Sequence, residues 1–312
     1  MNNIDVSELD CIYLSYDEPR ADEFWAQLRA NIPWAKRIHG VKGSDAAHKA
    51  AAQASETDRF ILIDGDNIPN YSFFNEQLRL GPTNDNCVFR WRAKNIINDL
   101  TYGNGGISCW TKEFAMNMRT HEATDGSDAT MVEFCYDPKY WAMHDTYSTT
   151  YPNQSPYHAW RAGFREGVKL CLDRGRRLSL ADFENTWQGN RHNLEIWCTV
   201  GRDVEYGEWA IQGARRGAYM TMFHESWDYT EVRDFDKLAE IWKLLSNTDN
   251  QADSFNHAYY LNNRLGLNIV ELDAKQSAWY KQHQRVYENI DIMLPEREYK
   301  KVINDAARSI RR

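Results

Sequence analysis

Two aspartates, Asp64 and Asp66, lie one residue apart directly after a short apolar segment at residues 60–63. Such a segment is typical of a buried strand, and Gly65 lets the chain turn so that both carboxylates can face one site. Carboxylate oxygens are hard ligands that suit Mg²⁺ or Mn²⁺, which usually bind a few carboxylates together with substrate phosphates. The alternative interpretation is an ordinary Asp-Gly turn after a strand, because both residues are common turn formers.

Two further segments are predicted to reach the same edge of the sheet. Tyr16 and Asp17 follow an apolar run at residues 11–15, and Lys42 lies in a glycine-containing loop ahead of a predicted helix at residues 44–55. Backbone amides at a helix N-terminus can bind phosphate, and Lys42 could contact the same group. The chain has no GxxxxGK[ST] motif and no GxGxxG after its first strand, which disfavours a P-loop ATPase and a dinucleotide-binding dehydrogenase.

The elements that must position these residues follow from the hydrophobic pattern. The first half predicts strands at residues 11–15, 37–41, 60–63, 87–91 and 105–110, and helices at residues 21–30 and 44–55, the second of which Ser44 is expected to cap. This alternation predicts an α/β fold with a largely parallel, Rossmann-like sheet flanked by helices. Such sheets bind ligands beyond the carboxyl ends of their strands, where Asp64 and Asp66 are expected.

The second half is predicted to be mostly helical, with helices at residues 157–172, 203–216, 234–245 and 296–311. The stretch HDTYSTTYPNQSP, residues 144–156, is rich in Thr, Tyr, Asn and Pro. We interpret it as the boundary loop between residues 1–150, which hold the paired aspartates, and a helix-rich portion at residues 151–312. One compact unit is an equally good interpretation of the same pattern.

Composition and charge limit the classes of protein that the sequence fits. The chain has 312 residues, a hydrophobic share of 42% and a net charge of −8. No apolar run approaches the roughly 20 residues that span a bilayer, and the N-terminus is polar and acidic, so a cytoplasmic protein is expected. The six cysteines form no CxxC pair and are expected to be reduced and buried. The acidic balance disfavours a general nucleic-acid binder but leaves room for a local basic face.

One predicted helix concentrates basic residues on one side. It begins at Ser155 and Pro156, and a basic stripe formed by Arg161, Arg165 and Lys169 lies beside its apolar stripe. Further basic residues follow directly, namely Arg174, Arg176 and Arg177. Two interpretations remain open: an amphipathic surface helix with solvated charges, or a face that follows the phosphates of double-stranded DNA.

The segments YLSYDEP and HGVKGSDAAHKAAAQASETDRFILIDGDN resemble the nucleotide-sugar-binding half of GT-A glycosyltransferases. Asp64-Gly65-Asp66 resembles their DxD motif, which binds Mn²⁺ or Mg²⁺ and, through the metal, the diphosphate of the sugar donor. The resemblance implies that Asp66 is a direct metal ligand and that Asp64 lies nearer the ribose or the sugar. The residues implied to contact the donor are Ser15, Tyr16, Asp17, Lys42, Asp64, Asp66, Asn104, Gly105 and Gly106.

The same resemblance implies two more kinds of site residue. GT-A enzymes often take a third metal ligand from a late histidine or aspartate, and His224 is the candidate because it follows an apolar run interpreted as a strand. The alternatives are His144 and His158. An inverting transferase also needs a carboxylate that deprotonates the acceptor hydroxyl, and Asp125 or Asp128 is favoured for this role over Glu122. A retaining enzyme needs no such base.

The second half resembles a narrower group, the bacteriophage glycosyltransferases that modify hydroxymethylated pyrimidines in DNA. The stretches that carry this resemblance are TYPNQSPYHAWRAGFREGVKL and WCTVGRDVEYGEWAIQGARRGAY. The resemblance implies transfer from a UDP-sugar to 5-hydroxymethylcytosine in phage DNA, in the host cytoplasm. Acceptors of other kinds (a surface glycan, a lipid or a protein) fit the same donor-binding half.

Two functions outside sugar transfer also fit a carboxylate pair at a sheet edge. One is a non-catalytic nucleotide-binding or nucleic-acid-binding protein that keeps the fold. The other is a metal-dependent nucleotidyltransferase, which would consume a nucleoside triphosphate and release pyrophosphate. The sequence identifies neither the sugar nor the oligomeric state.

Overall fold

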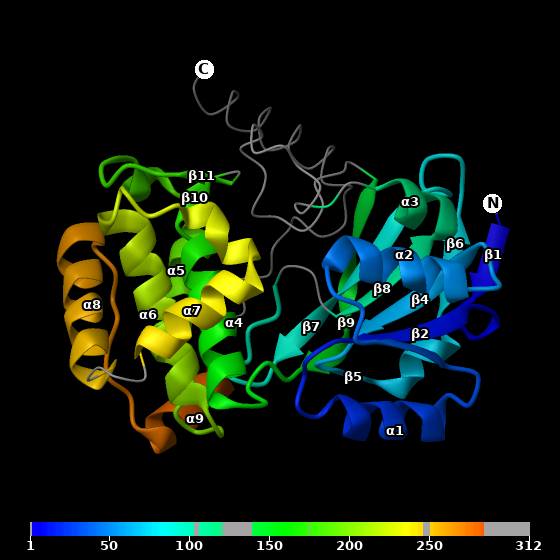
Figure 1. Cartoon of the computed structure of the whole chain (residues 1–312), viewed down its shortest axis with the longest axis horizontal. Coiled ribbons are helices and arrows are strands. Elements are labelled where there is room, and N and C mark those ends of the chain that lie inside the picture. Colours follow the sequence, from blue (N-terminus) through cyan, green and yellow to red (C-terminus); the bar gives the residue numbers. More distant parts are fainter. Residues whose placement is uncertain are drawn as a thin grey trace.

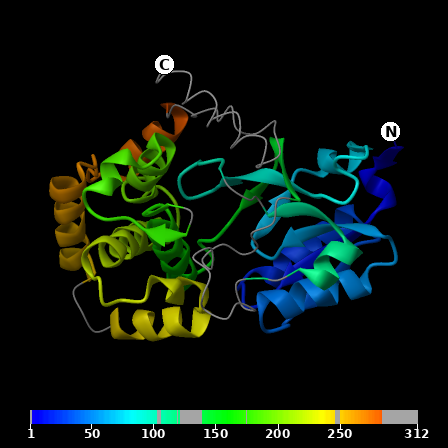
Figure 2. The same ribbon diagram turned by 90° about the horizontal axis from the view of Figure 1, so that it is seen from above.

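The computed structural model describes residues 2–102, 106–118, 120, 139–173, 175–245 and 250–283. These residues form two lobes that lie side by side (Figures 1 and 2). The first lobe holds a mixed sheet covered by helices, and the second lobe is built almost wholly from helices. The fold is therefore of the mixed α/β class.

Seven of the described strands form the main sheet, in the spatial order β3-β2-β4-β8-β7-β9-β5. Their bounds are β2 Asp10–Ser15, β3 Lys36–His39, β4 Arg59–Asp64, β5 Asn67–Pro69, β7 Val88–Asn95, β8 Ile107–Thr111 and β9 Tyr140–Thr150. β2 pairs in parallel with β3 and β4, and β7 pairs in parallel with β9. β8 runs antiparallel to both β4 and β7, and β5 runs antiparallel to β9.

The prediction of a largely parallel sheet was therefore too simple. The strand predicted at residues 105–110 exists as β8, but it enters between β4 and β7 in the reverse direction. A local hydrophobic pattern marks a strand without fixing its direction, because direction depends on which distant strands pair with it. Parallel pairing holds where it matters for the site, among β3, β2 and β4.

The segment interpreted as a boundary loop is mostly strand. β9 contains residues 144–150, and only residues 151–155 separate it from the next helix. Threonine and tyrosine fit a pleated surface well, and this preference outweighs the polar character that suggested a loop. Tyr147 packs against the same apolar cluster as Phe73 and Trp91, which ties β9 into the first lobe.

Helices cover both faces of the main sheet. They are α1 Ala21–Asn31, α2 Ser44–Ala54 and α3 Lys112–Asn117. Phe24 of α1 belongs to the same cluster as Ile61 of β4, whereas Ala51 of α2 shares a second cluster with Phe60 and Leu62. Successive residues of β4 thus enter different clusters, as expected for a strand that is buried on both faces.

The start of α2 differs from the prediction in one detail. Its N-cap residue is Gly43, which has a φ of 92°, and Ser44 is the first residue of the helix rather than its cap. A positive φ of this size favours glycine over any other residue. The smaller elements of the first lobe are β1 Asn2–Asp5 and β6 Gln77–Leu80, which pair antiparallel, and the 3₁₀ helices η1 Val6–Glu8 and η2 Tyr71–Asn75.

The second lobe is organised around two closely packed helices, α4 and α6. Its elements are α4 Pro156–Lys169, β10 Leu172–Asp173, β11 Arg176–Arg177, η4 Asp182–Asn185, α5 Gln188–Trp197, α6 Gly207–Phe223, η5 Tyr229–Arg233, α7 Phe235–Leu245, α8 Asn250–Leu265 and α9 Ala274–His283. A Cβ atom at Gly163 of α4 would lie 1.9 Å from the carbonyl oxygen of Ala210 of α6. Glycines thus let the two backbones touch, as Gly213 also does from the α6 side.

A segment of the first half packs into the second lobe. Ile97 and Leu100, which lie between β7 and β8, are buried in the same apolar cluster as Trp197 and Ala214. The boundary predicted at residue 150 therefore does not divide the chain into two separate cores. Residues 96–102 complete the core of the helical lobe although the neighbouring strands belong to the sheet.

The environments of the cysteines agree with the prediction of reduced, buried thiols. The described cysteines, Cys11, Cys87, Cys109, Cys171 and Cys198, are all buried and form no disulfide with one another. Cys135 lies outside the described residues. Within the described part of the chain, no helix has the length and apolar character needed to cross a bilayer.

His257 of α8 makes the helical lobe sensitive to acid. Desolvation lowers its pKa to about 4, and the nearby positive charge of Arg216 contributes to this lowering. The unfolded chain therefore binds a proton at His257 at a higher pH than the folded chain does, so stability is lost as the pH falls from about 6.5 towards 4. We expect His257→Gln to reduce the loss of unfolding free energy between pH 7 and pH 5 by about 1 to 2 kcal/mol, measured by urea denaturation.

The exposed His144 of β9 provides the matched control for this prediction. We expect His144→Gln to leave the pH dependence of stability unchanged. An equal acid sensitivity in wild type and His257→Gln would show that another group causes the loss.

Candidate functional site

Three neighbouring parallel strands bring predicted site residues to one edge of the sheet. The carboxyl ends of β2, β3 and β4 lie at Ser15, His39 and Asp64. Ser15 Oγ lies 2.9 Å from Nδ1 of His39, and the amide of Gly40 donates to the carbonyl oxygen of Ser15 at 3.0 Å. The segments after these strands therefore share one edge, as expected from the sequence.

Tyr13 and Glu18 both contact the turn that follows β4. The hydroxyl of Tyr13 donates to the carbonyl oxygen of Gly65 at 2.7 Å. A Cβ atom at Gly65 would lie 2.7 Å from Oε2 of Glu18, so a larger residue does not fit without displacing this carboxylate. Glycine between Asp64 and Asp66 thus allows a third acidic side chain to come close.

That third carboxylate, Glu18, is a site residue that the sequence analysis does not single out. Its Oε2 accepts a hydrogen bond from the amide of Tyr16 at 2.7 Å, which turns the side chain back towards Gly65. The signal that identifies it is its position: Glu18 follows β2 closely, as Asp66 follows β4, and the two strands are neighbours.

The three carboxylates influence one another's ionisation. Desolvation is the largest cause of the raised pKa of Asp64, of Asp66 and of Glu18. The charge of Asp66 raises the pKa of Asp64 and of Glu18 further. The Asp64 side chain is exposed to solvent, however, so burial explains little of the rise in its pKa. The negative charges of Asp66 and Glu18 explain this rise better. Negative charge gathered at an accessible edge attracts cations.

The carboxylate oxygens of this edge are of the type that hard divalent cations such as Mg²⁺ or Mn²⁺ prefer. Asp66 accepts hydrogen bonds from Asn67 Nδ2 at 2.7 Å and from Thr150 Oγ1 at 3.1 Å, which orient its carboxylate. Oδ1 of Asn67 is buried without a hydrogen-bond partner among the described residues. No three Asp, Glu, His or Cys side chains of the described chain form a complete metal site. Substrate phosphates and water commonly complete the shell of these two ions.

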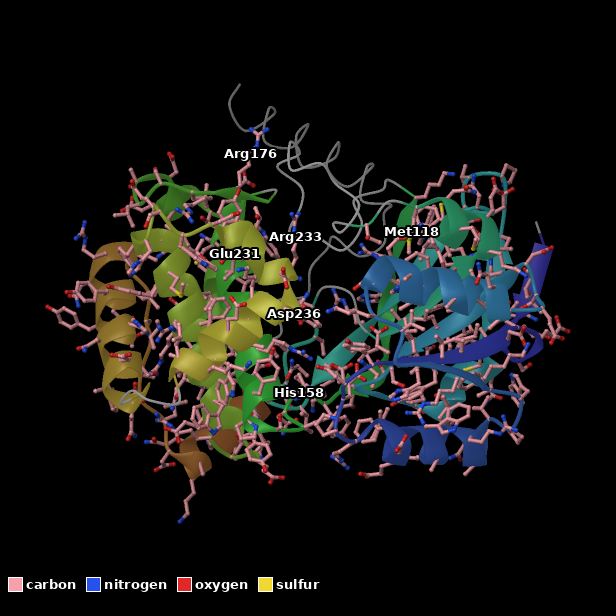
Figure 3. The ribbon with its side chains drawn as sticks, viewed as in Figure 1. Met118, His158, Arg176, Glu231, Arg233 and Asp236 are labelled. Atoms are coloured by element: carbon pink, nitrogen blue, oxygen red, sulfur yellow. The ribbon has the colours of Figure 1, made fainter. Side chains whose placement is uncertain are left out.

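Side chains of the second lobe contact the same edge. Arg161 of α4 holds Asp17 with two hydrogen bonds, from Nη1 to Oδ2 at 3.0 Å and from Nη2 to Oδ1 at 3.4 Å. Nε2 of His158 lies 3.7 Å from Oδ1 of Asp17, and Figure 3 shows His158 on the side of the second lobe that faces the first. Burial alone would raise the pKa of Asp17, but the neighbouring His158 ring and the hydrogen bonds and charge of Arg161 hold it well below its usual range.

A second ion pair joins the lobes, with its cation in the first lobe and its carboxylate in the second. Nζ of Lys42, in the loop before α2, lies 2.9 Å from Oδ2 of Asp236 at the start of α7. Figure 3 shows Asp236 near the middle of the molecule, where the lobes meet. Both partners are exposed, at 73% and 77% of their side chains, so the pair is open to exchange with solvent ions.

The basic residues predicted to contact DNA do not form one open face. The Arg161 side chain is only 11% exposed, and the Arg165 guanidinium stacks over the ring of Phe235 at 5.1 Å. Nζ of Lys169 lies 3.9 Å from Glu166 of the same helix. Arg177 donates to backbone carbonyls, including that of Glu225 at 2.9 Å, whereas Arg176 is exposed. Most of these basic side chains thus contact other parts of the protein. The helical pattern of the sequence does not reveal these contacts.

The prediction that His224 follows a strand was wrong. His224 is the C-cap residue of α6, and its ring packs edge-on against Tyr219 at 5.2 Å. The apolar run before it belongs to a buried helix, which periodicity over a few residues does not distinguish from a strand. His224 therefore lies on the helical lobe beside α8 and does not join Asp64 and Asp66 in a metal site among the described residues.

The glycine-rich segment meets the carboxylate turn at Gly106. The amide of Asp64 donates to the carbonyl oxygen of Gly106 at 2.9 Å, and a Cβ atom on Gly106 would collide with the side chain of Asn67. Several other predicted site residues lie outside the described residues, namely Asn104, Gly105, Glu122, Asp125, Asp128 and Arg174. Their roles stay predictions.

The site thus consists of carboxylates at parallel strand ends, with one arginine and one histidine supplied by the other lobe. Comparison of the chain with protein-family models, with curated proteins and with solved structures finds no match in any of the three.

Proposed function

We propose that the protein is a metal-dependent glycosyltransferase that moves a sugar from a UDP-sugar to a 5-hydroxymethylpyrimidine, such as 5-hydroxymethylcytosine, in double-stranded DNA. The observation that carries the donor half of this proposal is the position of Asp64 and Asp66 at the carboxyl end of β4, beside Glu18. A nucleoside diphosphate bound at such an edge requires a cation, and hard carboxylates are the groups that recruit one.

In this proposal the first lobe is a GT-A core. Its support is the parallel group β3-β2-β4, with α1 after β2 and α2 after β3, and the Asp64-Gly65-Asp66 turn after β4. Gly106 gives further support, because the glycine-rich segment adjoins this turn through its contacts with Asp64 and Asn67.

The residues of the chain would bind and orient the donor. A divalent cation held by Asp64 and Asp66 would supply positive charge to the departing diphosphate. Thr150 and Asn67 keep the Asp66 carboxylate in one orientation through the hydrogen bonds described above. The acceptor hydroxyl attacks the anomeric carbon, and the bond from that carbon to the diphosphate oxygen breaks. In an inverting reaction a carboxylate such as Asp125 or Asp128 would take the hydroxyl proton.

The DNA acceptor rests on the resemblance of residues 150–170 and 197–219 to bacteriophage DNA-modifying transferases. These two segments contain α4 and most of α6, which pack tightly against each other and bring Arg161 to the sheet edge. The same donor site would serve a glycan, lipid or protein acceptor, so the experiment must separate the acceptors.

We expect the mass of 5-hydroxymethylcytosine nucleosides to increase by one sugar after incubation of double-stranded DNA with the protein, Mn²⁺ and a panel of UDP-sugars. Mass spectrometry of the digested DNA identifies the donor and the acceptor together. DNA with ordinary cytosine is the matched substrate control and should gain no mass. Hydrolysis of a UDP-sugar without any gain on DNA would assign the protein to another acceptor, and consumption of nucleoside triphosphates with pyrophosphate release would indicate nucleotidyl transfer.

A further inference from the structure

Two cations that could bind a phosphate are each held by a carboxylate from the opposite lobe. Arg161 of the second lobe is paired with Asp17 of the first, and Lys42 of the first lobe is paired with Asp236 of the second. Asp17 and Lys42 follow β2 and β3, which lie on the same side of β4 in the sheet, and Arg161 and Asp236 belong to α4 and α7 of the second lobe. The two ion pairs therefore join the lobes across the candidate donor site.

Arg161 is held in a fixed orientation. Its guanidinium lies over the ring of Phe235 at 4.2 Å and over the ring of Tyr157 at 5.2 Å. Both terminal nitrogens point at the two oxygens of one carboxylate, at 3.0 and 3.4 Å. A guanidinium placed in this way is prepared to bind two oxygens of any planar or tetrahedral oxyanion, phosphate included.

Arg161 also lies within electrostatic reach of the carboxylate turn. The guanidinium bonds Asp17, and the carboxylate of the next residue, Glu18, lies against Gly65, between Asp64 and Asp66. A phosphate bound beside Asp66 would therefore lie close to Arg161.

We propose that the diphosphate of the donor displaces Asp17 from Arg161, so that α4 of the helical lobe forms one side of the donor site. This inference rests on the proposed function, because it takes the ligand to be a nucleoside diphosphate. Asp17 then serves in the ligand-free protein as an internal substitute for the phosphate. This proposal assigns Arg161, the first residue of the basic stripe of α4, to the donor rather than to DNA.

Charge balance supports this exchange. The site brings together the carboxyl groups of Asp17, Glu18, Asp64 and Asp66, and a donor adds the charges of its diphosphate. One divalent cation cannot compensate all of these charges, and a largely buried arginine attracts a phosphate strongly because little water screens it. Asp17 is 37% exposed and can turn to solvent when it is displaced, whereas Arg161 is 11% exposed and stays in place.

The test is calorimetric titration of the full chain with UDP in the presence of Mn²⁺. We expect Arg161→Gln to weaken UDP binding by about 10- to 100-fold, which is the usual effect of losing one charge-assisted, two-bonded contact. Arg161→Lys keeps the charge but not the paired nitrogens, so it should bind with intermediate affinity. Asp17→Asn removes the competing carboxylate and should bind UDP at least as tightly as the wild type.

Arg165→Gln is the matched control, because Arg165 lies one turn further along α4 and stacks on the same Phe235 ring. It should bind UDP within about threefold of the wild type. Thermal unfolding of each variant shows whether the fold is kept, and the Arg161→Lys protein supplies the comparison if Arg161→Gln unfolds.

The outcomes separate the two proposals. If the wild type binds no UDP, the proposed function fails and takes this inference with it. If the wild type binds UDP and folded Arg161→Gln binds it equally well, only the role of Arg161 is overturned. A loss of about tenfold or more with Asp17→Asn would overturn the exchange, because Asp17 would then be a donor contact rather than a substitute for the donor.

Discussion

Asp66→Asn is expected to reduce kcat/KM for the proposed sugar transfer by at least about 100-fold, because changing residues that merely orient metal ligands already costs up to that factor. Asp66 would contribute an anionic oxygen directly, and asparagine offers only a neutral one. The residues that hold Asp66 in place, Asn67 and Thr150, would remain. Transfer of sugar to DNA measured at several Mn²⁺ concentrations gives the factor.

This loss should occur without unfolding. The Asp66→Asn protein would lose one accepted hydrogen bond at this position, but it would also lack the repulsion that raises the pKa values of Asp64 and Glu18. We therefore expect the free energy of unfolding to change by less than about 1 kcal/mol. Binding of Mn²⁺ in the presence of UDP, followed by electron paramagnetic resonance, should weaken together with activity.

Asp58→Asn is the control for a change of charge alone. Asp58 is exposed and immediately precedes β4, at the opposite end of the strand from Asp64. Its variant should keep full activity. Wild-type activity in a folded Asp66→Asn protein would contradict the assignment of the carboxylate pair to the metal and the donor.

The second large effect concerns stability and is expected from Gly163→Ala. The added Cβ would lie 1.9 Å from the carbonyl oxygen of Ala210 and 2.8 Å from its carbonyl carbon, both of which are backbone atoms of α6. Because backbone cannot rotate away, the helices must separate, and we expect a loss of about 3 kcal/mol of unfolding free energy in urea denaturation. Alanine favours an isolated helix by about 1 kcal/mol over glycine, so a loss must come from packing.

Gly81→Ala is the matched control, because no atom lies within 4 Å of a Cβ built there. It should unfold at nearly the wild-type urea concentration. A Gly163→Ala protein as stable as Gly81→Ala would show that α4 and α6 are not in backbone contact. Since Arg161 and Gly163 are close together on α4, a separation of the helices should also weaken UDP binding.

Local sequence patterns were sufficient for the elements whose residues pack along one stripe or follow one strand. The strand before Asp64, the helices α1 and α2 and the Ser155 cap of α4, whose side chain accepts from the amide of His158, lie close to where the sequence predicts them. Each of these depends on neighbours within a few positions, where side-chain period and capping chemistry act.

The features that the sequence did not reveal depend on contacts between distant residues. The direction of β8 is set by pairing with β4 and β7, and the pairing of Arg161 with Asp17 joins positions far apart in the chain. Glu18 becomes a site residue because Gly65, which follows a neighbouring strand, leaves room for its carboxylate. No period or motif within one segment encodes contacts of this kind. The position of the paired aspartates at a strand end could therefore be predicted, and the contact of α4 with that edge could not.

The packing of residues 96–102 has a consequence for any attempt to divide the chain. A fragment that ends at residue 150 would carry Ile97 and Leu100 without the helices that bury them, and the complementary fragment would lack these side chains in its interior. Each piece would present apolar surface to water and tend to aggregate when produced alone. The two lobes should therefore be obtainable only as one polypeptide or as fragments expressed together, and unfolding should proceed as a single cooperative transition.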